Sequence, residues 1–182
     1  MANIKKVDRM IKKLNMIYKR GYLPEREAKE YSLLYTRAVN CFGHACFNLS
    51  DSDLNELDPY MKELERFLRD FGNCGIGNYF KVAQERIRKV GLQIQESSLS
   101  EKIKDNQWKI AYYIMCDEFR GTDIHFMIQT KSGKWTCKRG LDSDVEVFDK
   151  LPANYDKDYS FAGVYKITNP YVKLDEEKDM EM

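Results

Sequence analysis

The chain has 182 residues, of which 43% are hydrophobic and 32% charged, and its formal net charge is +1. This length suffices for one compact domain with a substantial core, and the composition is that of an ordinary globular protein. A net charge near zero excludes a bulk electrostatic attraction to nucleic acid or to a membrane surface. No stretch approaches the ~20 apolar residues of a membrane span, so we expect no membrane partner.

The first half of the chain is predicted to be helical. Apolar residues from Ile4 to Ile17 recur at intervals of three and four, and Gly21 is a natural stop for that helix. Pro24 is predicted to open a second helix that runs through Ala38, and Ser50 to cap a short turn. Two further helices are predicted at residues 59–72 and 79–91, separated by the glycine loop "GNCGIGN", which lacks the features of a phosphate-binding loop.

The second half changes to short runs rich in β-branched and aromatic residues, which are typical of strands. These runs are "WKIAYYIMC", "DIHFMIQT", "KWTCKR", "VEVF" and "FAGVYKIT". Ser132-Gly133 is predicted to form the hairpin turn between the second and third runs. Residues 95–107, between the halves, are expected to form a loop or a short helix. The order predicts an α+β fold, with N-terminal helices followed by an antiparallel sheet.

We expect a single compact domain with three parts. Residues 1–39 form an N-terminal helical extension, residues 40–174 the core, and residues 175–182 an acidic tail. The first 20 residues carry seven basic side chains against one acidic side chain. Within them, Lys12 and Lys13 are candidate contacts to nucleic acid, although a basic stretch of this kind is commonly a solvated surface.

Five cysteines, an odd number, show no zinc-ligand spacing, so we expect free thiols, no metal site and no cofactor. Free thiols are typical of a reducing compartment. The N-terminal residues carry charges where a secretory signal would need an apolar segment. We therefore expect a cytoplasmic location in a host cell.

Cys41 and His125 form the candidate catalytic pair. A thiol attacks as its thiolate, and an imidazole partner or a helix N-terminus favours that form. Cys41 is predicted at the start of a helix in "NCFGHACFNL", and His125 on a strand that faces it. Each residue alone is as readily explained as part of a packed core, and His44 is interpreted as a structural or rim residue.

Two stretches resemble a known family. "NCFGHACFNL" is similar to the Asn-Cys-Tyr-x-x-Ala nucleophile motif of papain-like NlpC/P60-type proteins, and "DIHFMIQTKSGKWTCKRG" is similar to their histidine block. The resemblance covers residues 40–167 and implies a papain-like core in which Cys41 attacks and His125 shuttles the proton. Cys137 stands where the family has its orienting histidine, which leaves Gln129 or Asp123 for that role.

The sequence leaves three functions open. The first is a cysteine amidase or peptidase of the NlpC/P60 type. The second is a metal-independent ribonuclease on the same scaffold, in which His125 would act with Lys138 or Arg139 as phosphate contacts. The third is a non-catalytic binding protein that docks through the basic first helix.

The whole chain also resembles type II-A anti-CRISPR proteins of phages and plasmids, which implies Cas9 or its guide RNA as the partner. The favoured interpretation is an intracellular counter-defence protein that acts on Cas9 or its guide RNA, with RNA cleavage as one mode of action. His125 is the first candidate for an essential side chain, ahead of Cys41.

Overall fold

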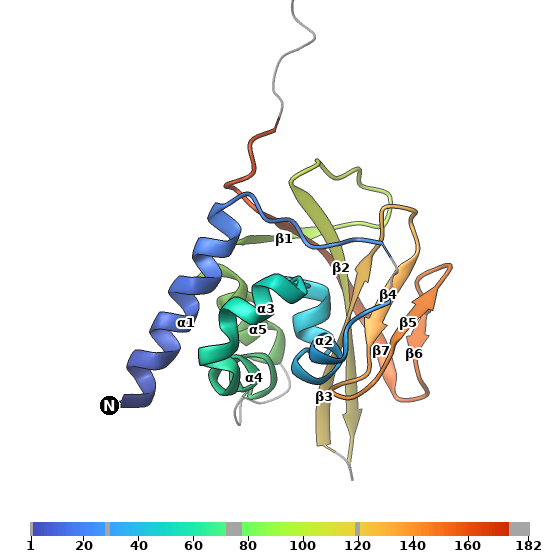
Figure 1. Ribbon diagram of the computed structural model, residues 1–182. Helices are drawn as coiled ribbons and strands as arrows, with labels where there is room; N and C mark the ends of the chain where they lie inside the picture. The colour runs from blue at the N-terminus through green and yellow to red at the C-terminus, as the bar shows by residue number, and fades with distance from the viewer. Residues whose placement is uncertain (1, 28–29, 72–77, 119–120, 175–182) are drawn as a thin grey trace, which may run out of the picture.

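The computed structural model describes residues 2–27, 30–71, 78–118 and 121–174. The helices pack together on one face of a seven-stranded antiparallel sheet, as Figure 1 shows. The prediction of an α+β fold, with helices first and the sheet after them, is confirmed. Most of the glycine loop and the whole acidic tail lie outside the described residues. No helix in the described part of the chain is both long enough and apolar enough to cross a membrane.

The helical half comprises seven described elements. They are α1 (Ala2–Lys19), α2 (Leu33–Ala38), the π-helical turn η1 (Gly43–Phe47), α3 (Asp51–Leu57), the 3₁₀ turn η2 (Asp58–Tyr60), α4 (Met61–Arg69) and α5 (Tyr79–Lys89). The predicted helices near α1, α4 and α5 are confirmed. Ser50 does more than cap a turn, because it forms a reciprocal capping box with Asp53 at the start of α3.

The predicted helix from Pro24 to Ala38 is wrong over its first part. In the part of this segment that the structure describes, helical structure begins at Leu33, where the Ser32 hydroxyl accepts a hydrogen bond from the Tyr35 N–H. The segment before it uses its carbonyls in tertiary contacts: Glu25 O accepts from the Asn48 side chain, and Arg26 O accepts from the Lys131 N–H. Those carbonyls therefore accept tertiary hydrogen bonds and not the i to i+4 hydrogen bonds of a helix.

The sheet has the strand order β1-β7-β2-β3-β4-β5, and β6 pairs separately with β7. The strands are β1 (Gln93–Ser97), β2 (Gln107–Asp117), β3 (Gly121–Gln129), β4 (Trp135–Lys138), β5 (Val145–Phe148), β6 (Asn154–Tyr155) and β7 (Tyr159–Thr168). The hairpin turn between β3 and β4 is confirmed, and its Gly133 has a φ of +86°. Residues 95–97 of β1 were predicted to lie in a loop or short helix. Only Ile94 of the five residues of this strand is buried, so the polar residues beside it gave no strand pattern.

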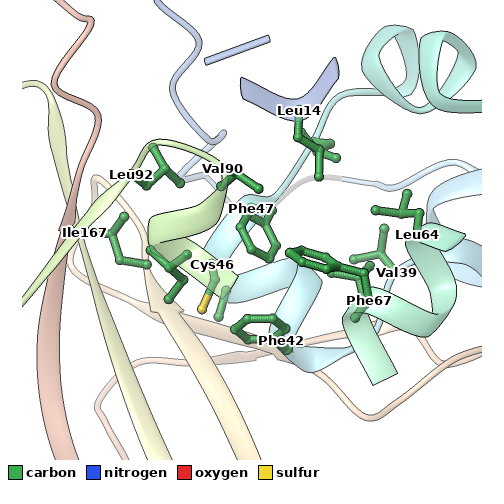
Figure 2. Close-up of a cluster of buried hydrophobic side chains, with 14 of the residues drawn as sticks. Leu14, Val39, Phe42, Cys46, Phe47, Leu64, Phe67, Val90, Leu92 and Ile167 are labelled. Carbon is green, nitrogen blue, oxygen red and sulfur yellow. The ribbon is translucent and has the colours of Figure 1, made fainter. Parts of the chain in front are cut away.

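The main core lies between the helices and the sheet. Figure 2 shows Phe42 and Phe47 among side chains that come from α1 (Leu14), α4 (Leu64) and β7 (Ile167). Several α1 residues, such as Leu14 and Ile17, are fully buried in this same cluster, so α1 contributes to the main core. A smaller cluster covers the opposite face of the sheet and contains Ala111, Tyr113, Met127, Trp135, Cys137, Tyr155 and Val164.

Candidate functional site

Cys41 is the first residue of a short helix, as predicted. The side-chain carbonyl of Asn40 accepts a hydrogen bond from the Gly43 N–H at 2.9 Å, and the side-chain amide of Asn40 donates a hydrogen bond to Leu68 O. Asn40 therefore caps the helix and ties its start to α4. The helix then widens into the π-helical turn η1, in which the Asn48 N–H bonds to Gly43 O at 2.7 Å.

Two buried hydrogen bonds hold this helix on the sheet. The Trp108 indole N–H of β2 donates to Ala45 O at 3.2 Å, and His44 Nε2 lies 3.0 Å from the Thr136 hydroxyl of β4. The Tyr35 hydroxyl donates to Asn48 Oδ1, so His44 Nδ1 must donate to Tyr35 and His44 Nε2 must accept from Thr136. Burial lowers the His44 pKa to about 3, and the nearby Lys138 charge lowers it further. His44 is thus a neutral structural residue.

The Cys41 sulfur lies at an edge of β3 that β4 leaves uncovered. Among the described residues, β4 pairs only with Met127, Ile128 and Gln129 of β3. Cys41 Sγ lies 3.9 Å from Ile124 O, and the Phe126 N–H also hydrogen-bonds to the sulfur. These two backbone groups flank His125, so the thiol lies beside the backbone of the predicted partner.

His125 has a buried imidazole on β3. Its side chain is 4% exposed, and its Nε2 is buried without a hydrogen-bond partner among the described residues. The ring stacks on Tyr155 and contacts the edge of Tyr159. Burial lowers the His125 pKa to about 3, with smaller contributions from the Arg139 charge and from His44. The imidazole is therefore neutral at physiological pH, in the form that can accept a proton.

Cys41 is also neutral in this environment. The Cys41 pKa is raised to about 12, chiefly by burial and also by the Asp123 carboxylate, whereas the Phe126 and Phe42 N–H groups oppose this rise. The resting state is thus a neutral thiol and a neutral imidazole that line the same cavity, and not a thiolate–imidazolium ion pair. Attack by the sulfur would require proton transfer to His125 as the new bond forms.

Cys41 and His125 line one cavity of about 730 Å³. Its walls are partly aromatic, with Phe71, Tyr79, Tyr155 and Tyr159 among the lining residues. The charged lining groups are four carboxylates and two guanidinium groups, a net formal charge of −2: Asp70, Asp123, Asp156, Asp158, Arg69 and Arg139. A concave site with aromatic walls and convergent polar groups is typical of a binding or catalytic pocket.

Arg139 lies at this cavity as predicted, but it is already engaged. Its guanidinium pairs with Asp156 at 3.1 Å and lies 3.8 Å from Glu146, and its Nε donates to the Tyr155 hydroxyl at 3.2 Å. Asp123 also lines the cavity, and its Oδ2 accepts from the Tyr159 hydroxyl at 2.6 Å. Of the two residues proposed to orient His125, Asp123 is thus the one that lies at the cavity.

Lys138 and Gln129 lie elsewhere, contrary to their predicted roles. The Lys138 side chain is fully buried, and its Nζ donates to Thr36 O at 2.6 Å and to Gly140 O at 3.0 Å. It anchors α2 to the loop after β4 and does not line the cavity. Gln129 points toward the hairpin turn, where its amide donates to Gly133 O at 3.4 Å. It lies four residues along the strand from His125, about 13 Å away by strand rise.

The basic residues of α1 form a separate surface. α1 lies on the outer side of the helical layer, with the helices between it and the sheet (Figure 1). Lys13 pairs with Glu56 at 2.6 Å, and Arg20 pairs with Asp53 and Glu56, whereas Lys12 is exposed. Neither Lys12 nor Lys13 lines the cavity. A nucleic-acid contact through these residues stays a prediction, and it would involve a different face of the molecule.

The sequence reasoning did not single out Tyr155 or Tyr159 of the cavity wall. Tyr155 lies on a two-residue strand, and no pattern in the sequence marks it as a neighbour of His125. Cys137 is buried in the smaller cluster, opposite Met127 in the β3–β4 register. Burial raises the Cys137 pKa, so at neutral pH it is a thiol, a poor acceptor for an imidazole N–H.

Comparisons with protein-family models, with curated proteins and with solved structures found no match for this chain. The described residues contain no group of three or more histidine, cysteine or acidic side chains placed to hold a metal ion. Function is therefore argued from the geometry of the site itself.

Proposed function

We propose that the cavity is the active site of a thiol-dependent amide hydrolase in which Cys41 is the nucleophile and His125 the general base. One observation carries this proposal. The Cys41 sulfur lies at the β3 edge between backbone groups of Ile124 and Phe126, and His125, whose buried Nε2 has no hydrogen-bond partner among the described residues, lines the same cavity. A helix-borne thiol and a strand-borne imidazole at one cavity are also the arrangement of the papain-like core that the motifs resemble, and we include that core in the proposal.

The reaction follows from the neutral resting state. The Cys41 sulfur would bond to the substrate carbonyl carbon as the thiol proton passes to His125. The imidazolium would then return that proton to the amide nitrogen as the carbon–nitrogen bond breaks, which leaves a thioester. Water, deprotonated by the same imidazole, would hydrolyse the thioester and regenerate the thiol.

The charge of the cavity bears on the choice of substrate. Its lining has a net formal charge of −2, and its aromatic rings can contact a cation through their faces. These features favour an amide substrate with a positively charged group near the scissile bond. They disfavour an RNA phosphate, because Lys138 is buried and Arg139 is already paired with carboxylates.

The counter-defence interpretation stays a prediction, and it concerns binding through a surface and not catalysis at the cavity. Binding to Cas9 or to its guide RNA would need a surface, and α1 offers exposed basic side chains such as Lys12 for that purpose. Such binding would not depend on Cys41 or His125. It can therefore be tested in the same experiments and separated from amide hydrolysis.

The decisive experiment measures amide hydrolysis and covalent labelling with matched variants. Wild type, Cys41→Ala, His125→Ala and the control Cys116→Ser, which alters an exposed cysteine on β2, are incubated with a peptide mixture and with a peptidyl vinyl sulfone. Mass spectrometry reads the cleaved bonds and the labelled residue. We expect wild type and Cys116→Ser to cleave and to be labelled at Cys41, and the two active-site variants to lose about 10³-fold or more of kcat/KM.

Two outcomes would count against the proposal. Undiminished cleavage by folded Cys41→Ala would exclude the thiol as nucleophile. Shortened guide RNA in a parallel incubation with Cas9, with and without EDTA, combined with no peptide cleavage, would favour the ribonuclease alternative.

A further inference from the structure

His125 lacks the polar partner that usually fixes the ring of a catalytic imidazole. Among the described residues, its Nε2 has no hydrogen bond, and Gln129 donates to the hairpin turn instead. The terminal torsion of a histidine side chain has broad minima, so an imidazole without a restraint samples several orientations. A general base must be held in one orientation to accept the proton of its nucleophile. Some other contact must therefore hold the His125 ring.

Tyr155 makes that contact. Its ring is stacked on the imidazole with 3.8 Å between ring centroids and 3° between ring planes. Tyr159 meets the same imidazole edge-on, with centroids 5.9 Å apart and an interplanar angle of 67°. A rotation of the imidazole about its terminal torsion would break the parallel contact with Tyr155.

Tyr155 is itself held from several directions. Its side chain is 3% exposed, and its hydroxyl accepts from Arg139 Nε at 3.2 Å and lies 3.5 Å from the Glu146 carboxylate oxygens. Arg139 is fixed in turn by Asp156 at 3.1 Å. The backbone of Tyr155 pairs with Tyr159 across the β6–β7 hairpin. The ring on which the imidazole stacks is thus held through both its hydroxyl and its backbone.

We propose that Tyr155 is the positioning residue of His125: its ring, and not a hydrogen-bond acceptor, holds the imidazole in the orientation of the general base. This inference rests on the proposed function. The stack also covers one face of the imidazole and excludes water from it, which favours its neutral form. The hydroxyl of Tyr155 serves to hold the ring and takes no part in the chemistry.

The test compares three substitutions in the full chain. Tyr155→Phe keeps the aromatic plane and removes the hydroxyl, Tyr155→Leu removes the plane, and Tyr155→Met removes the plane but preserves more of the side-chain volume. Two readouts are taken for each variant: kcat and KM for a peptide substrate, and ¹⁵N-histidine NMR across pH. The chain has only two histidines, so a His44→Gln variant assigns the His125 signals.

We expect Tyr155→Phe to retain most of the wild-type kcat. Tyr155→Leu and Tyr155→Met should lose about 10- to 100-fold in kcat with little change in KM, since they disturb orientation and leave the rest of the cavity intact. In the same two variants the His125 pKa should rise toward its ordinary value, because water reaches the ring. If Tyr155→Leu does not fold, Tyr155→Met decides the question.

The results separate this inference from the proposed function. Wild-type kcat and an unchanged His125 titration in a folded variant without the aromatic plane would overturn the positioning role, while leaving the Cys41 chemistry in place. Loss of kcat in Tyr155→Phe equal to that in Tyr155→Leu would also overturn it, because the hydroxyl would then be the active feature. If Cys41→Ala retains activity, the proposed function fails, and the NMR titration alone then decides whether Tyr155 holds the imidazole.

Discussion

Burial should make the Cys41 thiol slow to react with a small alkylating agent. With a pKa of about 12, about 3 in 10⁵ of the thiol is ionised at pH 7.5, whereas a free cysteine of pKa about 8.5 is about one-tenth ionised. A more basic thiolate is the better nucleophile, which recovers a factor of about 40. The net expectation is that Cys41 reacts roughly 80-fold more slowly in the folded protein than in the unfolded chain.

The assay is iodoacetamide labelling between pH 6 and 10, with peptide mass spectrometry to follow each cysteine. The rate at Cys41 should rise about tenfold per pH unit over the whole range, because the thiolate fraction rises in that proportion. The exposed Cys116 serves as the internal control, since its access is similar in the folded and the unfolded chain. A Cys41 rate that is independent of pH between 6 and 9 would refute the reasoning, since it would reveal a thiolate stabilised by imidazolium.

Three further outcomes follow from the structure. His44 and His125 each have a pKa of about 3 in the folded protein and about 6.5 in the unfolded chain. Their contribution to the free energy of unfolding is therefore fully present above pH 6.5 and is lost as the pH falls toward 3. Urea unfolding at pH 7.5, 6 and 5 should show a loss of up to about 1.4 kcal/mol per pH unit for each histidine, and a flat profile would contradict their burial. Gly43→Ala should lower the free energy of unfolding by about 1–3 kcal/mol, because a Cβ would lie 2.9 Å from Leu68 Cδ1 and Val39 Cγ1; an unchanged Tm would disprove this. Asp123→Asn should reduce the preference for cationic over neutral amide substrates several-fold relative to the surface control Asp149→Asn, and equal preferences in the two variants would remove Asp123 from substrate recognition.

Local patterns in the sequence were sufficient for much of the fold. The spacing of apolar residues from Ile4 to Ile17 predicts α1, and alternating β-branched and aromatic residues predict five of the seven strands. Ser132-Gly133 marks the hairpin, because a glycine can adopt the positive φ that this turn requires. The start of the helix at Cys41 could also be predicted from the sequence, since Asn40 is a good N-cap residue.

Several functional details depended on contacts between distant segments. The sequence predicts Lys138 to be an exposed basic residue of a turn. Its ammonium group is instead buried and donates a hydrogen bond to the Thr36 carbonyl of α2. Gln129 shares a face of β3 with His125, but the strand rise places it at the far end, beside the hairpin. Tyr155 lies 30 residues beyond His125, and only the β6–β7 hairpin brings its ring against the imidazole.

The sequence by itself determined most of the helices, five of the seven strands and their order along the chain, and it singled out Cys41 and His125 as the candidate pair. The tertiary structure decided which side chains lie at the cavity, which cations are buried or already paired, and the neutral state of Cys41 and His125. The physical reason is the range of the interactions. Periodicity and capping act over a few residues, whereas burial, pKa and ring stacking depend on neighbours that folding brings from elsewhere in the chain.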